Sequence, residues 1–314
     1  MAIRGWFVWE ELMTTDVAAA ASFYKKVSGL KTKQAPSDPN YTMFQAAKGN
    51  MGGLMTLPAE AKASGTPPSW ISYIGTPNAD ETARQAAAIG GKVAKAPFDI
   101  ADGGRIAILQ DPQGAIFAIY ANPKATAAPP PPTLGHASWH ELATSDHVGA
   151  FAFYQKLFGW YVVNDQDMGP GMGIYRLFAP EGSKDAIGGM YTKSPEPPRP
   201  TAWLPYIKVA DVKTATDKAK SLGATIFHGP AQVPGGGWIT MGADPQGAAF
   251  AIHSTPAAAP APKPKAAKKA KAVAKKKTAP KKKAAPKKKA APKKKMAAPK
   301  KKRMLKKRKA GSKK

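Results

Sequence analysis

The sequence of 314 residues contains no cysteine. Disulfide bridges, thiolate zinc sites and cysteine nucleophiles are therefore excluded. No apolar run approaches the roughly 20 residues that a membrane span needs, and none of signal-peptide length precedes the acidic pair Glu10 and Glu11. From these absences we expect a soluble protein of the cytoplasm with no membrane partner.

Acidic residues are missing from the last part of the chain. Between Ala257 and Lys314 there are 27 lysines and arginines and no aspartate or glutamate. The formal net charge of +28 belongs almost wholly to this tail. The tail repeats the unit Ala-Ala-Pro-Lys-Lys-Lys and contains little that is apolar beyond alanine. Such a segment cannot bury enough surface to offset its chain entropy, so we expect it to be disordered.

The composition of the tail resembles the C-terminal tails of linker histones and histone-like bacterial proteins. A mobile cation of this density would neutralise phosphates and release counterions, which favours sequence-independent binding to nucleic acid and, in the cell, association with the nucleoid. The alternatives are a solvated tail that only aids solubility and a tail attracted to anionic lipid. The tail residues expected to contact phosphates are Lys281, Lys282, Lys283, Lys287, Lys288, Lys289, Lys293, Lys294, Lys295, Lys300, Lys301, Lys302 and Arg303.

The rest of the chain contains an internal repeat. The pentapeptide DPQGA occurs at Asp111 and again at Asp244, each time before an apolar run. The segment WFVWEELMTTDVAAAASFYKKVSGL, which begins at Trp6, aligns with HASWHELATSDHVGAFAFYQKLFGW, which begins at His136. Self-similarity over this length indicates that one domain has been duplicated.

Each half of the repeat is predicted to hold two βαβββ modules. FVWEELMTT has the alternation of a strand, and Asp16 is a plausible N-cap for a helix that Gly29 ends. NADETARQAAAIGG is a second capped helix, and GGRIAILQDPQGAIFAIY is a hairpin. The predicted fold is α+β, with four such modules in two domains. The predicted segments are a first domain at 1–124, a proline-rich linker at 125–133, a second domain at 134–255 and the disordered tail at 256–314.

These motifs together resemble the vicinal oxygen chelate superfamily. The resemblance rests on a first strand ending in TTD or TSD, a helix that carries SFY or FAFY and ends at GL or GW, and a DPQG hairpin before an apolar strand. The superfamily contains glyoxalase I, bleomycin resistance proteins and extradiol dioxygenases. The resemblance covers residues 3–124 and 134–255. It implies two cup-shaped sheets, each around a ligand cavity that often carries a divalent metal.

The metal positions of the family carry no donor atoms in this sequence. One ligand position falls on Trp9 and Trp139, and another falls on Ala118 and Ala251. The strands SWISYI and TAWLPYI also lack the histidine often found there. Divalent metals need several histidine, carboxylate or amide side chains at one point. We therefore predict no metal and no other cofactor.

Strand parity predicts what lines the cups instead. Side chains two apart on a strand share a face, so Glu11 should face the same cavity as Trp9. In the alternative interpretation the tryptophans are core residues, and the glutamates pair with an arginine or cap a backbone group. The expected cup residues are the catalytic carboxylates Glu11 and Glu141 and the ligand-binding side chains Trp9, Trp139, Tyr120 and His253.

Other side chains in the repeat are expected to be structural. Trp70 and Trp203 open later strands and should pack in the core. His140 has the opposite parity from Glu141, which places it against the helix layer or at a domain contact. Leu12 should likewise face the helices.

Three functions fit these features. The first is a glyoxalase-like lyase or isomerase that works without the usual metal triad, uses Glu11 or Glu141, and is tethered to nucleic acid by its tail. The second is a ligand-sequestering protein of the bleomycin-resistance type. The third is an architectural nucleic-acid-binding protein. The partners would be a small-molecule ligand and nucleic acid, and the chain would be a monomer or a homodimer.

Overall fold

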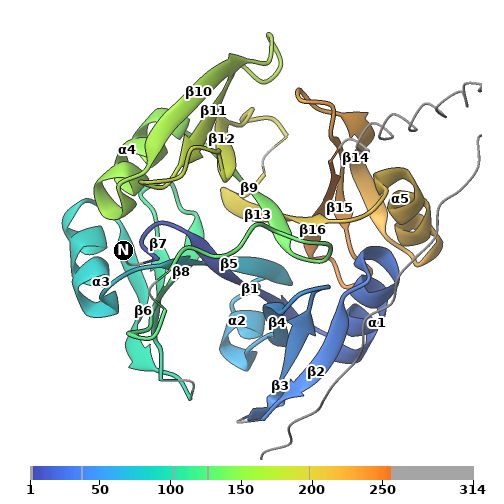
Figure 1. The fold of residues 1–314 in the computed structure, drawn as a ribbon, viewed down its shortest axis with the longest axis horizontal. Helices are drawn as coiled ribbons and strands as arrows, with labels where there is room; N and C mark the ends of the chain where they lie inside the picture. Colours follow the sequence, from blue (N-terminus) through green and yellow to red (C-terminus); the bar gives the residue numbers. More distant parts are fainter. Residues whose placement is uncertain (1–2, 37, 102, 126, 198, 256–314) are drawn as a thin grey trace, which may run out of the picture. The chain divides into compact units, whose positions relative to one another are not determined.

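The computed structural model describes residues 3–36, 38–101, 103–125, 127–197 and 199–255 (Figure 1). The predicted disordered tail at 256–314 lies outside the described residues. In the first half, the elements in chain order are β1 (Phe7–Thr14), α1 (Val17–Ser28), β2 (Lys31–Ala35), β3 (Asp38–Gln45), β4 (Asn50–Thr56), α2 (Ala59–Ala63), β5 (Ser69–Gly75), α3 (Ala79–Ala88), β6 (Lys92–Asp99), β7 (Arg105–Gln110) and β8 (Ile116–Ala121). In the second half they are β9 (Ala137–Thr144), α4 (His147–Phe158), β10 (Tyr161–Asp167), β11 (Ile174–Ala179), β12 (Gly188–Thr192), β13 (Ala202–Lys208), α5 (Val212–Ser221), β14 (Thr225–Gln232), β15 (Trp238–Ala243) and β16 (Ala249–Ser254).

The strands form two eight-stranded sheets with the same topology. The first has the order β2-β3-β4-β1-β5-β8-β7-β6, and the second has the order β10-β11-β12-β9-β13-β16-β15-β14. In each sheet two βαβββ modules join edge to edge through antiparallel strands, β1 with β5 and β9 with β13. The predicted α+β fold of four modules in two curled sheets is confirmed. The short helix α2 was not predicted.

The first helix of each half begins and ends as its sequence predicts. The Asp16 side chain accepts a hydrogen bond from the Ala19 amide, and Gly29 ends α1 with a φ of 74°. A positive φ is free of steric cost only for glycine, which explains the residue at this position. Asp146 and Gly159 play the same parts in α4.

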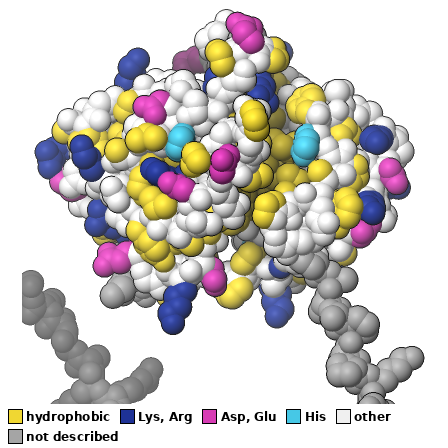
Figure 2. All heavy atoms as spheres, turned by 90° about the horizontal axis from the view of Figure 1, so that it is seen from above, with side chains coloured by type: hydrophobic (Ala, Val, Ile, Leu, Met, Phe, Trp, Pro, Cys, Tyr) yellow, Lys and Arg dark blue, Asp and Glu magenta, His cyan; other side chains and the backbone are white. Residues whose placement is uncertain are grey.

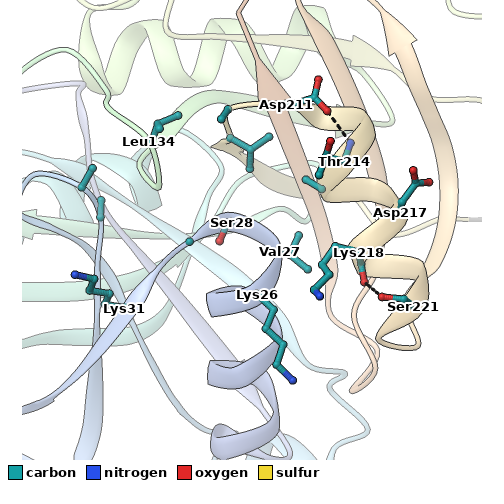
Figure 3. A pocket seen from close by; sticks show the side chains of 16 residues that line it. Lys26, Val27, Ser28, Lys31, Leu134, Asp211, Thr214, Asp217, Lys218 and Ser221 are labelled. Atoms are coloured by element: carbon teal, nitrogen blue, oxygen red, sulfur yellow. Dashed lines mark hydrogen bonds between the residues drawn. The ribbon is translucent and has the colours of Figure 1, made fainter.

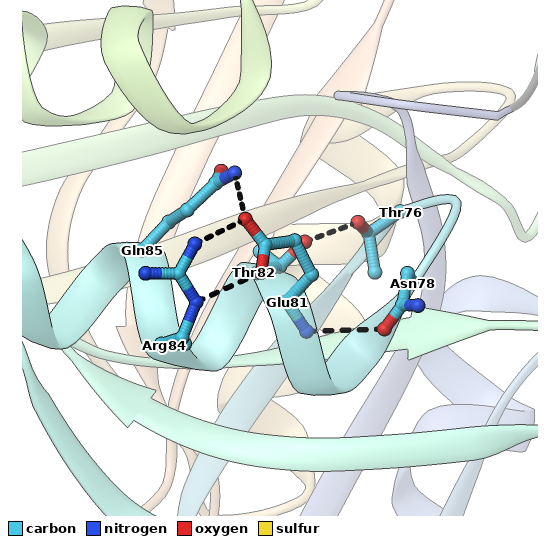
Figure 4. A network of polar contacts seen from close by, with 6 residues as sticks. All are labelled: Thr76, Asn78, Glu81, Thr82, Arg84 and Gln85. Carbon is cyan, nitrogen blue, oxygen red and sulfur yellow. Dashed lines mark hydrogen bonds and ion pairs between the residues drawn. The ribbon is translucent and has the colours of Figure 1, made fainter.

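Helix α3 begins with a small polar network (Figure 4). Asn78 Oδ1 accepts a hydrogen bond from the Glu81 amide at 3.0 Å, which caps the helix. Glu81 in turn accepts hydrogen bonds from Arg84 and Gln85 on the next turn. The Arg84–Glu81 pair is largely exposed, so we assign it little stability. This network confirms the predicted capped helix.

Two hydrophobic cores cross from one half of the chain to the other. Helix α1 packs beside α5, and α3 lies near α4 (Figure 1). One core joins Phe23 and Leu54 of the first half to Val212 and Phe250 of the second. Because both halves contribute to each core, the two sheets belong to one compact unit.

The side chains predicted to be structural lie in these cores. Leu12 is fully buried, and Trp70 and Trp203 are 7% and 4% exposed. Trp70 packs against Tyr24 and Phe44 on the helix side of the first sheet. The predictions for these residues are confirmed.

Candidate functional site

The face of each sheet that lies away from its helices carries a repeated polar cluster. We call these faces the first cup (β1–β8) and the second cup (β9–β16). In the first cup, Trp9 and Glu11 stand on β1, and Trp9 pairs in register with Tyr73 of β5. The Trp9 indole donates to the Tyr41 hydroxyl at 2.9 Å, and this hydroxyl donates to Glu11 Oε2 at 3.0 Å. The Tyr73 hydroxyl donates to Glu11 Oε1 at 3.1 Å. Both carboxylate oxygens of Glu11 therefore accept a phenol hydrogen bond.

The second cup repeats this cluster at equivalent positions. The Trp139 indole donates to the Tyr175 hydroxyl at 2.9 Å, and that hydroxyl donates to Glu141 Oε2 at 3.0 Å. The Tyr206 hydroxyl donates to Met241 Sδ at 3.4 Å and also acts on Glu141, whose pKa it lowers. We call the two sets the tyrosine–glutamate clusters. Strand parity correctly placed each glutamate with its tryptophan.

Glycine makes room for one tyrosine in each cluster. Gly53 of β4 lies directly beside Glu11 of β1, as its partner in the parallel ladder between these strands. A β-carbon at Gly53 would lie 2.2 Å from the Tyr41 hydroxyl oxygen, and one at Gly189 would lie 2.1 Å from the Tyr175 ring. The tyrosines can cross the sheet toward the glutamates only because these two positions have no side chain.

Burial shifts the acid–base behaviour of the clusters. Desolvation raises the pKa of Glu11 and of Glu141, and the phenol hydrogen bonds oppose that rise. Desolvation together with the neighbouring glutamate also raises the pKa of Tyr41 and of Tyr73. The tyrosines thus stay protonated as donors, and each glutamate is a stronger base than an exposed carboxylate.

The rest of the first cup is apolar. Ile71, Tyr73, Ile106 and Ala118 form a buried cluster at the base of the cup. The half-buried side chains packed against this cluster are Val8, Trp9, Met13, Phe98, Ile100, Ile108 and Tyr120. The structure therefore brings the predicted Tyr120 and Trp9 to one wall. A mostly apolar wall with a few polar groups is the usual lining of a small-molecule site.

The second cup has a different polar group on its wall. The predicted His253 of β16 is half-buried, and its Nδ1 lies 3.0 Å from the Ser138 hydroxyl. The equivalent residues in the first cup are Tyr120 and Val8. Figure 2 looks onto the side where β10–β12 and β14–β15 lie and shows a hollow with hydrophobic side chains along it. The two cups share a carboxylate but differ in polarity.

The structure argues against the alternative interpretation in which the glutamates pair with an arginine or cap a backbone group. Among the described residues, neither glutamate forms an ion pair with an arginine or caps a backbone group. Their partners are the tyrosines, which the sequence reasoning did not name. The signal was available in the repeat, since Tyr41 aligns with Tyr175 in a shared Tyr-x-x-Phe pattern, and Tyr73 aligns with Tyr206 before isoleucine.

His140 lies at a contact between the two halves, one of the two positions that strand parity predicted for it. Its Nε2 lies 2.6 Å from Glu10 Oε1, and both side chains are buried. Glu10 Oε2 accepts a second hydrogen bond from the Ser72 hydroxyl at 2.5 Å. Phe7 stacks on the imidazole at 3.6 Å. Glu10 and His140 occupy equivalent positions of the repeat, so two copies of one position have become complementary.

Two curled sheets of four βαβββ modules, each with a carboxylate at the centre of its concave face, define a tandem glyoxalase-like protein. The chain belongs to the Glyoxalase/Bleomycin resistance protein/Dioxygenase superfamily, whose family profile matches residues 6–119 and 133–252. The resemblance predicted from the sequence is thereby confirmed. No helix among the described residues has the length and apolar character needed to cross a membrane.

Several known proteins are similar over most of the chain. "Putative glyoxylase CFP32" of Mycobacterium tuberculosis (strain CDC 1551 / Oshkosh) is 29% identical over 247 residues, covering 78% of this chain and 92% of that protein. "Anthracycline biosynthesis protein DauV" of Streptomyces sp. (strain C5) is 27% identical over 271 residues, covering 81% and 94%. The solved Mn(II)-bound glyoxalase from Novosphingobium aromaticivorans superposes with a TM-score of 0.57 at 16% identity, covering 81% of this chain and 83% of that chain. At that identity the solved structure supports the fold alone.

The residues of the cups do not fit a family-type metal site. The described residues contain no group of three or more histidine, aspartate or glutamate side chains placed to hold an ion. At the centre of each cup there is one carboxylate, which already accepts two phenol hydrogen bonds in the first cup and one in the second. Ala118 and Ala251, at one family ligand position, lie beside Tyr73 and Tyr206 in the parallel ladders. Methyl groups and phenols are not the donor set that a divalent ion needs.

Proposed function

We propose that each cup binds a small aromatic molecule without a metal, and that Glu11 or Glu141 accepts a proton or a hydrogen bond from it. The observation that supports this proposal is the recurrence of the tyrosine–glutamate cluster at equivalent positions of both cups. A half-buried or buried carboxylate is costly to keep ionised, so its presence at the centre of two concave faces favours use over packing. The indoles of Trp9 and Trp139 supply flat surfaces for stacking.

The reaction class that fits the clusters is proton abstraction, as in a lyase or an isomerase. The glutamate would take a proton from the ligand, and the raised pKa makes it a better base at neutral pH. The protonated carboxyl group would then return the proton to another atom of the ligand. The phenols would remain protonated throughout and hold the carboxyl group in place.

The proposal can be tested with 2-naphthol, a flat aromatic alcohol whose excited state gives its proton to a nearby acceptor. Binding beside the glutamate should produce naphtholate emission above that of the free probe in buffer, and E11Q and E141Q should each remove about half of this excess. The double variant should remove nearly all of it. Y161F, which changes an exposed tyrosine on β10, is the control and should leave the emission unchanged. Equal emission from the double variant and the parent would refute the role of the glutamates.

A second candidate is a sequestering protein that binds its ligand without reaction. The observation that favours it is that both oxygens of Glu11 already have phenol partners, so the carboxylate is stable without turnover. The name of the Streptomyces relative, an anthracycline biosynthesis protein, is compatible with a flat polycyclic ligand in either case. The two candidates separate in E11Q and E141Q once a ligand is known. If the parent turns the ligand over and the variants bind it without turnover, the protein is an enzyme. If the parent binds the ligand and shows no turnover, the protein is a sequestering protein.

We further propose that the tail at 256–314 tethers the cups to nucleic acid. The supporting observation is its 27 cations with no acid between Ala257 and Lys314. The affinity for duplex DNA should fall steeply with salt and be independent of sequence. Removing residues 257–314 should abolish low-salt DNA binding in an electrophoretic mobility assay. Retained binding would refute the tether, and equal binding to anionic vesicles would favour lipid as the partner.

A further inference from the structure

A cavity of about 510 Å³ lies between the two halves of the chain. Its walls come from equivalent parts of the repeat. Residues 6–10 of the first half face their counterparts among residues 136–140 of the second, and the β3–β4 turn faces the β11–β12 loop. The prolines at 129–132, in the connection between the halves, form the remaining wall. We call this space the interdomain cavity.

Divergence between the repeats accounts for the space. Phe7 and Val8 on β1 have smaller counterparts on β9, Ala137 and Ser138. A pair of identical halves with phenylalanine at both positions would place more side-chain volume at this contact. The cavity therefore depends on the difference between the halves as well as on their connection.

His136 is one of the residues that line the cavity. The Thr133 amide donates to His136 Nδ1 at 3.3 Å, so Nδ1 is the acceptor and the ring proton lies on Nε2. The Thr133 hydroxyl is also 2.9 Å from Nδ1. Burial lowers the pKa of His136, which favours this neutral form. Within the part of the chain that the structure describes, Nε2 has no hydrogen-bond partner.

Most other polar groups of the wall have partners or cancel. His140 Nε2 and Glu10 Oε1 are hydrogen-bonded at 2.6 Å, and His140 Nδ1 is buried without a hydrogen-bond partner among the described residues. Lys48 and Asp185 are exposed at the rim and carry opposite charges. The remaining surface offers the half-buried indole of Trp6 and the flat proline rings at 129–132. Such walls suit an uncharged, flat and apolar ligand.

We propose that the interdomain cavity binds a flat aromatic molecule through a carbonyl oxygen that accepts the Nε2 hydrogen bond of His136. The volume is within the range of small-molecule sites, about 300–1,000 Å³. This site is separate from the glutamates of the cups, although Trp9 contributes to both. The interdomain cavity requires a ligand that accepts a hydrogen bond, whereas the cups require a ligand that donates one.

A matched pair of uncharged probes tests the proposal on the full chain. 2-Acetylnaphthalene carries the carbonyl, and 2-ethylnaphthalene has the same shape without it. Titrations followed by NMR should give 2-acetylnaphthalene about a tenfold lower Kd, the size of one net hydrogen bond. H136F should remove that difference and leave 2-ethylnaphthalene binding nearly unchanged. E11Q/E141Q should retain the full preference.

Measurement on the unsubstituted protein guards against a variant that fails to fold. The ¹⁵N resonance of His136 Nε2 should shift on saturation with 2-acetylnaphthalene and not with 2-ethylnaphthalene. Equal affinity of the two probes, or no shift at His136, would overturn the proposal. Loss of the preference in E11Q/E141Q would place the ligand in the cups and would also overturn it, while leaving the proposed function of the cups intact.

Discussion

The Tyr24 hydroxyl of helix α1 donates a hydrogen bond of 3.0 Å to Asp244 Oδ2, which lies 220 positions later in the chain. The repeat produces the same bond in the other direction, from Tyr154 of α4 to Asp111, also at 3.0 Å. Asp244 Oδ1 meanwhile accepts the amide of Ala248 within its own turn. Each DPQG turn thus uses one carboxylate oxygen to hold its own backbone and the other to hold the opposite half of the chain.

This double use predicts that Y24F is markedly destabilising. The substitution leaves Asp244 Oδ2 and the Trp70 indole, which also donates to Tyr24, without their partner in a buried region. Hydrogen bonds to charged groups contribute about 1.5–3 kcal/mol, so we expect the free energy of unfolding to fall by about 2 kcal/mol. Urea denaturation followed by fluorescence measures it. Y154F should cost a similar amount, and a loss below about 0.5 kcal/mol in both variants would contradict this role.

The Glu10–His140 pair predicts a charge-swap pattern. H140E would bury two carboxylates against each other, and we expect it to cost about 3–5 kcal/mol, as when a buried pair is broken. The double variant E10H/H140E restores the pair in reverse and should recover part of that loss. Recovery should be incomplete because Ser72, the second partner of Glu10, is replaced by Pro205 at the equivalent position.

Thermal and urea unfolding of the parent, both single variants and the double variant complete this cycle. A double variant no more stable than H140E would show that orientation and packing, and not the pair itself, decide the stability of this contact. The exposed pair Arg84–Glu81 provides the control, because E81Q should change stability by at most about 0.5 kcal/mol.

The sequence predicted features that depend on local chemistry or on repetition. Alternation and caps located β1, α1 and α3, and strand parity placed Glu11 beside Trp9 and kept Leu12 away from them. These predictions succeed because side-chain direction along a strand or helix follows from backbone geometry alone. The donors to Glu11 come from β3 and β5. Only the sheet order shows that β5 lies next to β1 and that β3 lies on the other side of β1, beyond β4.

Contacts between the halves could not be predicted from either half. Tyr24 and Asp244 each had a sufficient local explanation, as a helix residue and a turn residue. Their hydrogen bond depends on how the two sheets pack, which no short pattern encodes. Strand parity placed His140 either against the helix layer or at a domain contact, and it did not predict the partner Glu10. Equivalent positions of a repeat are normally expected to carry similar groups.

The close contacts at Gly53 and Gly189 predict that adding one methyl group at either position lowers the stability of the protein. G53A would place a β-carbon 2.2 Å from the Tyr41 hydroxyl oxygen, so the phenol must leave Glu11 or the strands must separate. Overpacking of this kind costs about 1–3 kcal/mol. We expect a loss of stability in that range for G53A and for G189A in urea denaturation. G171A, whose added β-carbon has no neighbour within 4 Å, is the matched control and should be neutral. Wild-type stability in G53A would contradict the packing described here.

The raised pKa values of Glu11 and Glu141 predict how stability depends on pH. A carboxyl group whose folded pKa is above its ordinary value of 4.5 binds its proton more tightly in the folded state. Between that ordinary value and the folded pKa, the folded state therefore holds more protons, and the free energy of unfolding falls as pH rises. E11Q/E141Q removes this dependence. The stability of the double variant relative to the parent should thus increase from pH 4 to pH 7.5 and be constant below about pH 4. Other titrating groups, including Asp111 and Asp244, are present in both proteins and cancel in the difference. Urea denaturation at intervals of half a pH unit measures it, and a difference that does not change with pH would show that the glutamates are solvated in the folded protein.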